Sequence, residues 1–363
     1  MGASRTCLPS SPGAPEQSGT TPRPPAVSVR ILIVGPAWVG DAVLAQPLMR
    51  RVKERHPGVR ITVLAPPWVL PVLSRMPEVD DTVENPFAHG AMGVAERRRF
   101  ARTLSGNYQH AIVLPNSFKS ALIPFFAGIP LRTGYIGEAR FGLLNDRRRL
   151  DEKALPLMVE RFAALAEAPG KALETPVPPP RLAIDAVARE MILARLELRT
   201  ERTVVVFCPG AEYGPAKRWP AAYYAELAAT LAHEGRQVWL LGSPKDAAIG
   251  DEIAQRANGA CVNLCGKTSL DEAVDLMSCA DLVVANDSGL MHVAAALDRP
   301  MIAIFGSSSP RFTPPLSVRA RVVRLDLPCS PCFKRECPLK HFKCMMDLTP
   351  ARLRTEIATA EKP

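Results

Sequence analysis

The sequence contains no uncharged apolar run of the roughly 18 to 20 residues that a membrane-spanning helix needs. It also begins without the apolar core of a secretory signal, because residues 1–28 are rich in Ser, Pro, Gly and Thr and show no apolar periodicity. We therefore expect a soluble, cytoplasmic chain whose first 28 residues are a disordered extension. A mis-assigned start codon would explain the same composition.

Signatures of nucleic-acid binding are missing as well, including the basic strand with interleaved aromatic residues that RNA-recognition motifs carry. The charge is nevertheless positive, at +9, and residues 30–153 hold 18 Lys and Arg against 11 Asp and Glu. Such a surface suits an anionic partner. We expect no nucleic acid, and instead a phosphorylated glycolipid, with peripheral contact with the membrane possible on its cytoplasmic face.

Paired CxxC motifs with the spacing of a zinc ribbon are absent, although four of the nine cysteines gather near the end of the chain. These are Cys329, Cys332, Cys337 and Cys344, with His341 between the last two. Four thiols in a short stretch fit a structural Zn²⁺ site, and equally fit free or redox-active thiols. The spacing leaves both interpretations open and gives no indication of a catalytic metal.

Apolar, β-branched runs alternate with helix-like stretches through most of the 363 residues, which is the pattern of repeated βαβ units and a parallel sheet. The length suits two α/β domains. We predict helices at 42–55 and 220–233, a helix start with a capping box at Ser269, and strands at 29–34, 60–65, 110–114, 203–208, 237–241, 281–285 and 301–305.

A proline-rich stretch marks the predicted domain boundary. Residues 173–181 contain four prolines, which can continue neither a helix nor a central strand, so we expect a stiff, extended linker at 173–182. The predicted domains are residues 29–172 and 183–328. Residues 329–363 then form a cysteine-rich segment and a C-terminal helix.

The first strand-end loop, residues 35–41, carries an aspartate where a phosphate-binding P-loop needs a lysine. A carboxylate would repel phosphate, so the P-loop interpretation fails. Asp41 then has two interpretations, an ordinary helix N-cap or a general base that takes a proton from an attacking hydroxyl. Its position alone favours the N-cap, which is the commoner role.

Two further strand-end loops suit an anionic ligand. Residues 208–220 combine two glycines with Lys217 and Arg218 near a helix start, which favours a diphosphate over a plain surface loop. In residues 285–292, Asp287 ends a buried strand and the following Ser-Gly opens a helix with free N–H groups. His292, one turn further, fits a core position as well as a ligand. The loop at 306–310 should line the same cleft.

Several long stretches resemble one family in order across residues 29–325. They are ILIVGPAWVGDAVLAQPLMRRVKERHP, VLPNSFKSALIPFFAGIPLRTGY, PLMVERF, CPGAEYGPAKRWP and NDSGLMHVAAALDRPMIAIFGSSSPRFTPPLS. They resemble the ADP-heptose:lipopolysaccharide heptosyltransferases of glycosyltransferase family nine, in particular the type II branch. The N-terminal extension has no recognisable counterpart in the family, and the cysteine cluster is absent from some of the relatives that share the other stretches.

This resemblance implies a GT-B fold, in which two Rossmann-like doubly wound domains face each other across a cleft. It implies that the N-terminal domain binds the lipid A-Kdo-heptose inner-core acceptor and the C-terminal domain binds ADP-heptose. By the same resemblance, Asp41 and Lys217 are catalytic. The implied donor-binding residues are Gly210, Arg218, Asp287, Ser288, Gly289, Leu290 and His292. The implied acceptor-side residues are Gly40, Asn116, Lys119 and Arg132.

The resulting hypothesis is an inverting transfer of heptose onto the first heptose of the inner core, without a cofactor or a metal. Asp41 would remove the proton of the acceptor hydroxyl, while Lys217 and Arg218 would neutralise the departing diphosphate. Heptosyltransferases of types I and III remain alternatives, as do a GT-B sugar-nucleotide epimerase and a nucleotide-binding regulatory module. The oligomeric state stays open.

Overall fold

The structure is a computed structural model that describes residues 1–2, 29–88 and 90–360. The predicted disorder of residues 1–28 thus falls almost entirely outside the described residues. Within those residues, no helix has both the length and the apolar character required to cross a lipid bilayer.

The N-terminal half forms a six-stranded sheet in the order β3-β2-β1-β4-β5-β6, and every strand pair is parallel. The central strand β1 is buried from Ile31 to Val34, as expected for a parallel strand that helices cover on both faces. The strands are β1 (Arg30–Val34), β2 (Arg60–Ala65), β3 (Asp81–Glu84), β4 (His110–Val113), β5 (Leu131–Tyr135) and β6 (Asp146–Arg148).

Five helices connect these strands or follow them, and the longest of them begins directly at the end of β1. They are α1 (Val39–Arg55), α2 (Leu70–Leu73), α3 (Val94–Arg102), α4 (Phe118–Phe126) and α5 (Met158–Ala164). Helix α1 begins three residues earlier than predicted, since Gly40 lowers helix propensity and obscures the start in the sequence. This places Asp41 inside the first turn of α1.

The C-terminal half repeats the design with a second parallel six-stranded sheet in the order β12-β11-β10-β7-β8-β9. Strands β7 and β10, at its centre, are buried at every position. The strands are β7 (Val204–Cys208), β8 (Gln237–Leu240), β9 (Val262–Asn263), β10 (Leu282–Asn286), β11 (Met301–Phe305) and β12 (Ala320–Arg324).

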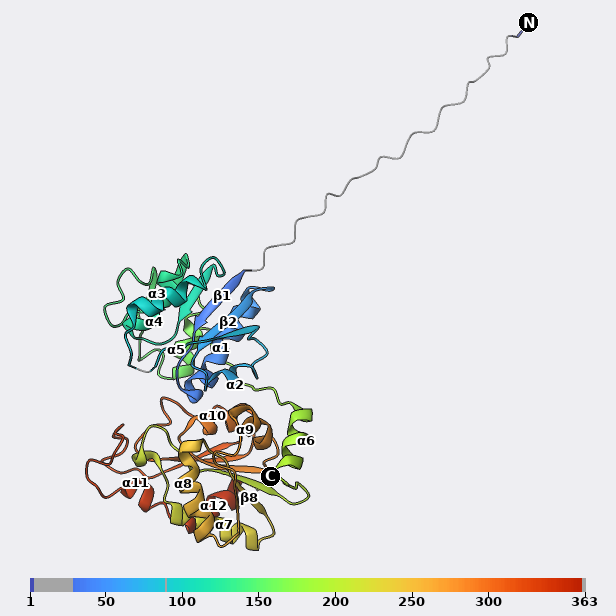
Figure 1. Cartoon of the computed structure of the whole chain (residues 1–363), viewed down its shortest axis with the longest axis vertical. Helices are drawn as coiled ribbons and strands as arrows, with labels where there is room; N and C mark the ends of the chain where they lie inside the picture. The colour runs from blue at the N-terminus through green and yellow to red at the C-terminus, as the bar shows by residue number, and fades with distance from the viewer. Residues whose placement is uncertain (3–28, 89, 361–363) are drawn as a thin grey trace.

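The helical elements of this half include the one with the predicted capping box, in which Ser269 and Glu272 each accept a hydrogen bond from the other's backbone N–H group. They are α6 (Ala186–Arg195), η1 (Pro215–Lys217), α7 (Ala221–His233), η2 (Pro244–Asp246), α8 (Ala247–Arg256), α9 (Leu270–Met277), α10 (Gly289–Ala296), α11 (Lys343–Met346) and α12 (Pro350–Ala360). Figure 1 shows the two halves as separate α/β lobes, with α1, α2, α9 and α10 where they meet.

Between α5 and α6 the chain contains neither helix nor strand, and it is held by side chains of both halves. The side-chain amide of Gln46, in α1, is fully buried and makes two hydrogen bonds with the backbone of Arg181. It donates to the Arg181 carbonyl oxygen at 2.6 Å and accepts from the Arg181 N–H at 2.5 Å. One residue on, Leu182 donates to the carbonyl oxygen of Ala296 at 3.2 Å. The connection therefore fixes α1 beside α10.

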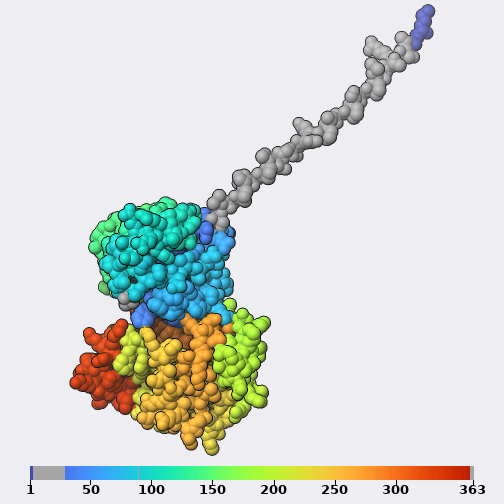
Figure 2. Space-filling model, viewed as in Figure 1, coloured from blue at the N-terminus to red at the C-terminus, as the bar shows by residue number. Residues whose placement is uncertain are grey.

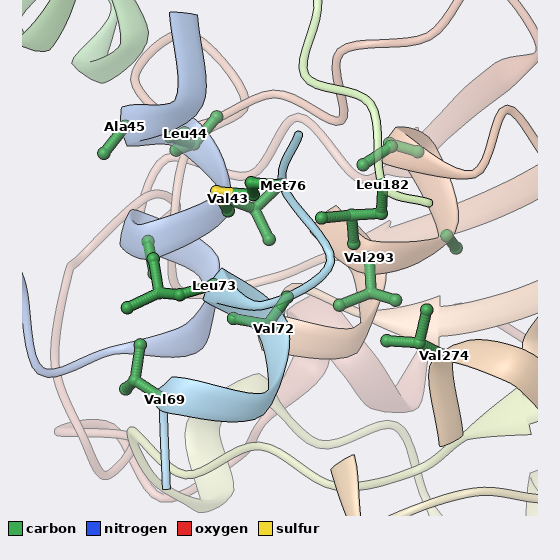
Figure 3. Packing of buried hydrophobic residues seen from close by; sticks show 14 of the residues in the cluster. Val43, Leu44, Ala45, Val69, Val72, Leu73, Met76, Leu182, Val274 and Val293 are labelled. Carbon is green, nitrogen blue, oxygen red and sulfur yellow. The ribbon is translucent and has the colours of Figure 1, made fainter. Parts of the chain in front are cut away.

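A continuous apolar layer joins the two halves. Val43 and Val72, from α1 and α2, belong to the same buried cluster as Val274 and Val293, from α9 and α10 (Figure 3). In the space-filling view the blue and green half rests directly on the orange and yellow one (Figure 2). Burial of this layer favours one fixed approach of the two halves.

An ion pair crosses the same interface. Arg75 donates to the carboxylate of Asp275 at 2.5 Å, and the Asp275 side chain has no exposed surface. The other oxygen of that carboxylate accepts from the backbone N–H of Asp185 at 2.9 Å. Because a buried carboxylate is costly without such partners, this pair specifies how the halves are aligned.

Candidate active site between the domains

Asp41 projects from the first turn of α1 toward the C-terminal half. The N-cap of this helix is Trp38, which makes no side-chain capping bond, so Asp41 is not the N-cap residue. Among the described residues, none donates a hydrogen bond to its carboxylate. The side chain is therefore placed as an acceptor without a partner at the carboxyl end of β1, where ligands of parallel sheets bind.

Lys217 approaches this point from the C-terminal half, on the short helix η1 that follows β7. Its ammonium group pairs with the Asp287 carboxylate at 2.6 Å and lies 5.2 Å from the centre of the Tyr213 ring. Ser308 also donates a hydrogen bond to that carboxylate. The loops after β7, β10 and β11 thus meet around one buried aspartate, as the strand-end argument predicted.

The charges of the two halves are close enough to affect one another. Burial raises the pKa of Asp41 to about 6, the nearby Lys217 ammonium opposes that rise, and the Asp287 carboxylate adds to it. A proton acceptor of this strength is still mostly ionised at neutral pH, yet binds a proton more readily than an exposed aspartate. The geometry brings the predicted base and the predicted cation to one site.

Two glycines allow this approach, since the starts of α1 and α10 cross in direct contact. A Cβ atom on Gly40 would lie 2.7 Å from the Cδ2 atom of His292, and one on Gly289 would lie 2.9 Å from the Cβ atom of Val39. Either distance is too short for carbon atoms, so neither position has room for a side chain. Gly40, expected on the acceptor side, lies against the opposite half.

His292 is buried in α10 beneath this crossing. Burial lowers the pKa of its imidazole to about 4, the Asp287 carboxylate opposes this, and the Lys217 ammonium adds to it. The ring is therefore neutral at physiological pH. The neutral His292 ring therefore adds no positive charge beside the Lys217–Asp287 ion pair.

A buried asparagine positions the loop that carries Lys217. Asn286, at the end of β10, donates to the carbonyl oxygen of Pro209 at 2.7 Å and accepts from the backbone N–H of Trp219 at 3.1 Å. These two hydrogen bonds hold the loop between β7 and α7 near both of its ends. The sequence analysis missed Asn286, although a polar residue at the end of an otherwise apolar strand was a usable signal.

Gly210 of this loop lies against Asp246 of η2. A Cβ atom on Gly210 would be 2.5 Å from the Asp246 carboxylate, which accepts from the hydroxyl of Ser243 at 2.7 Å. The sequence analysis did not single out Asp246. The guanidinium of Arg218 donates a long hydrogen bond, of 3.4 Å, to the carbonyl oxygen of Ala211.

The start of α10 is where the sequence predicted free N–H groups, and among the described residues no N-cap side chain accepts from them. Ser288 is its N-cap and makes no side-chain capping bond, and Gly289 is the first helical residue. The side chain of Leu290 packs partly buried against the core that joins the halves. Backbone donors at such a helix start favour an anion in front of Ser288.

The remaining acceptor-side residues lie on the N-terminal half. Asn116 is exposed and accepts a hydrogen bond from the buried Arg140, while Lys119 lies in the first turn of α4. The guanidinium of Arg132 donates to the carbonyl oxygens of Leu143 at 2.6 Å and Ile129 at 2.5 Å. Arg132 therefore has a local structural role whatever else it binds.

The four clustered cysteines line one small cavity together with the buried, unpartnered hydroxyl of Ser307. Burial raises the pKa of the Cys344 thiol, and the other three cysteines add to that effect. In residues 1–2, 29–88 and 90–360, however, no three His, Cys, Asp or Glu side chains are arranged to hold a metal ion.

A carboxylate from one doubly wound domain facing a lysine from the other suits transfer between a hydroxyl and a phosphate-bearing donor. The two domains and the site between them define a glycosyltransferase of the GT-B class. Residues 97–343 match the model of glycosyltransferase family 9 (heptosyltransferase). The chain belongs to this family of enzymes, which confirms the resemblance found in the sequence.

Individual relatives agree over almost the whole chain. It is 49% identical to lipopolysaccharide heptosyltransferase 2 of Salmonella typhimurium, over 91% of this chain and 97% of that protein. The solved structure of E. coli ADP-heptose lps heptosyltransferase II is 46% identical, with a TM-score of 0.82, over 92% of this chain and 98% of that one. A family 9 glycosyl transferase from Veillonella parvula, at 21% identity and a TM-score of 0.78, shares the fold.

Proposed function

We propose that this enzyme transfers L-glycero-D-manno-heptose from ADP-heptose to the first heptose of the lipopolysaccharide inner core. Relatives that share nearly half of their residues with this chain are named heptosyltransferase 2. The name of the solved structure from E. coli includes ADP-heptose. The observation that carries the proposal is Asp41 facing Lys217 across the domain interface. A transferase needs a base and a leaving-group cation on opposite sides of the reacting carbon.

Asp41 is the general base of the proposed reaction. The acceptor hydroxyl approaches from the N-terminal half and gives its proton to the Asp41 carboxylate as its oxygen bonds to the anomeric carbon. The bond to the diphosphate breaks on the opposite face, so the anomeric configuration inverts. Because Asp41 has no hydrogen-bond partner among the described residues, its oxygens are available to the incoming hydroxyl.

Lys217 is the cation that stabilises the departing ADP. Its charge lies where the diphosphate develops negative charge, and Arg218 and the N–H groups at the start of α10 add to it. Gly210 lets the backbone approach the donor closely. Asp287, Ser288, Leu290 and His292 complete the proposed donor pocket, with Asp287 holding Lys217 in position.

The acceptor side of the proposal rests on the basic surface of the N-terminal half. Asn116 and Lys119 lie near the end of β4 and the start of α4, whereas Arg132, also proposed for the acceptor side, pairs with Ala111 at the opposite, amino-terminal edge of the sheet. We assign the acceptor-binding domain to residues 29–172 and the donor-binding domain to residues 183–328. A lipid-linked acceptor places the enzyme at the cytoplasmic face of the inner membrane as a peripheral protein.

The direct test is incubation of purified protein with ADP-heptose and a heptose-Kdo₂-lipid acceptor, followed by mass spectrometry. Transfer adds one heptose to the acceptor and releases one ADP. Transfer only to Kdo₂-lipid, or only to a two-heptose acceptor, would assign the enzyme to another type in the family. Donor turnover without acceptor would instead indicate an epimerase or a hydrolase.

A further inference from the structure

The cysteine-rich segment, which precedes α12 and contains residues 329–344, is hydrogen-bonded to the loop that carries Lys217. The backbone N–H of Ala216 donates to the carbonyl oxygen of Arg335 at 3.0 Å, and the Tyr213 hydroxyl donates to that of Phe333 at 2.9 Å. Phe333 in turn donates its N–H to the carbonyl oxygen of Ser307 at 2.6 Å. The segment therefore lies along the edge of the proposed donor pocket.

A glycine makes this contact possible. Gly214 has a φ of +151°, and a Cβ atom there would lie 2.5 Å from the carbonyl oxygen of Arg335. Any other residue would be strained and would push the segment away. The loop and the cysteine-rich segment are thus fitted to one another.

The consequence is that a second cation, Arg335, reaches the Tyr213 ring that Lys217 also contacts. The guanidinium of Arg335 lies 5.3 Å from the centre of the Tyr213 ring, and the Lys217 ammonium lies 5.2 Å from the same centre. Lys217 is neutralised by Asp287 at 2.6 Å. Among the described residues, in contrast, no carboxylate pairs with Arg335, and its side chain is exposed.

We propose that Arg335 is a donor-binding residue that contacts the diphosphate of the sugar nucleotide together with Lys217. This inference rests on the proposed function, because it assumes a nucleoside-diphosphate donor. A diphosphate carries two negative charges, which Lys217 and Arg218 cannot balance fully while the Asp287 carboxylate remains beside Lys217. An arginine also presents several N–H groups in a plane, which suits phosphate oxygens.

The test compares the binding of ADP and of adenosine by isothermal titration calorimetry to the full-length protein and its variants. Arg335→Ala should weaken ADP binding roughly tenfold, the usual scale for one charge-assisted hydrogen bond, and should leave adenosine binding unchanged. Arg335→Lys should fall between. Lys334→Ala is the matched control, because it removes an equal exposed charge from the neighbouring position, whereas it is Arg335 that lies over the Tyr213 ring.

The outcomes separate this inference from the proposed function. Wild-type protein that fails to bind ADP would refute the donor assignment. Wild-type protein that binds ADP while Arg335→Ala binds it equally well, or while Lys334→Ala loses as much affinity, would overturn the role of Arg335. An equal loss for ADP and adenosine, or a lowered melting temperature, would show that Arg335 only supports the fold.

Discussion

Replacing Asp41 by asparagine should make the protein more stable while it destroys the activity. Asparagine has the shape of the protonated aspartate but never ionises. In the folded protein, burial raises the pKa of Asp41 from its ordinary 3.8 to about 6, with Lys217 opposing the rise and Asp287 adding to it. The ionised carboxylate therefore lowers the free energy of unfolding of the wild type, and the variant lacks this destabilising charge.

The gain in the free energy of unfolding from Asp41→Asn should depend on pH. Above pH 6 the side chain is ionised in both the folded and unfolded wild type, so the cost is fully present. Below 3.8 it is protonated in both, and the cost vanishes. At about 1.4 kcal/mol per factor of ten in acidity, Asp41→Asn should gain up to about 3 kcal/mol at pH 7.5 and less than about 1 kcal/mol at pH 4.

The assay is unfolding of the ligand-free wild type and variant at both pH values, with transfer activity measured on the same samples. Asp80→Asn is a control of opposite sign. Burial alone would raise the pKa of Asp80, but its 2.5 Å contact with Lys53 and the N–H of Ile61 hold that pKa below the ordinary value. Ionised Asp80 thus stabilises the fold above its unfolded pKa, and its variant should lose stability at pH 7.5.

Two results would refute the reasoning about Asp41. One is a variant no more stable than the wild type at pH 7.5. The other is a gain that persists undiminished at pH 4, which would indicate a packing effect instead of an ionisation. Loss of at least about a hundredfold in kcat is expected alongside, since a general base contributes on that scale. Full activity of Asp41→Asn would exclude its role as the base.

Three further predictions concern the same site. The kcat/KM of the wild type should fall below pH 6, as protonation of Asp41 removes the base; an acid limb near pH 4 would assign the proton to another group. Lys217→Ala should raise the KM for ADP-heptose and lower kcat by roughly a hundredfold; unchanged donor kinetics would contradict its role. Gly40→Ala, whose new methyl would lie 2.7 Å from the buried His292 ring, should lower kcat about tenfold or more and should also lower the melting temperature. Full activity of that variant would mean that the two halves need not touch at this point.

Much of the fold was predictable because its central strands are easy to recognise in the sequence. Val204–Cys208 and Leu282–Asn286 are buried on both faces, and such strands appear in the sequence as short β-branched or apolar runs. Edge strands were not predictable in this way. Asp81–Glu84 and Asp146–Arg148 contain mostly polar residues, because each has a neighbouring strand on one side only.

The candidate site was predictable to the extent that it follows strand ends. The loops after β1, β7, β10 and β11 were identified from glycine and charged residues that follow apolar runs, and three of them converge on Asp287. The contacts made by the cysteine-rich segment were not predictable. Spacing of thiols bears on metal chemistry, whereas the role of Arg335 depends on which loop the segment reaches in space.

The strength of Asp41 as a base is itself a product of the domain interface. The carboxylate is desolvated because α1 lies against α10. This close contact between the helices needs two glycines, Gly40 from the N-terminal half and Gly289 from the C-terminal half. The apolar layer that includes Val43 and Val293 holds the helices together. Separation of the halves would return Asp41 to water and lower its pKa toward 3.8. The same packing that costs the protein stability at neutral pH therefore gives its base the proton affinity that transfer requires.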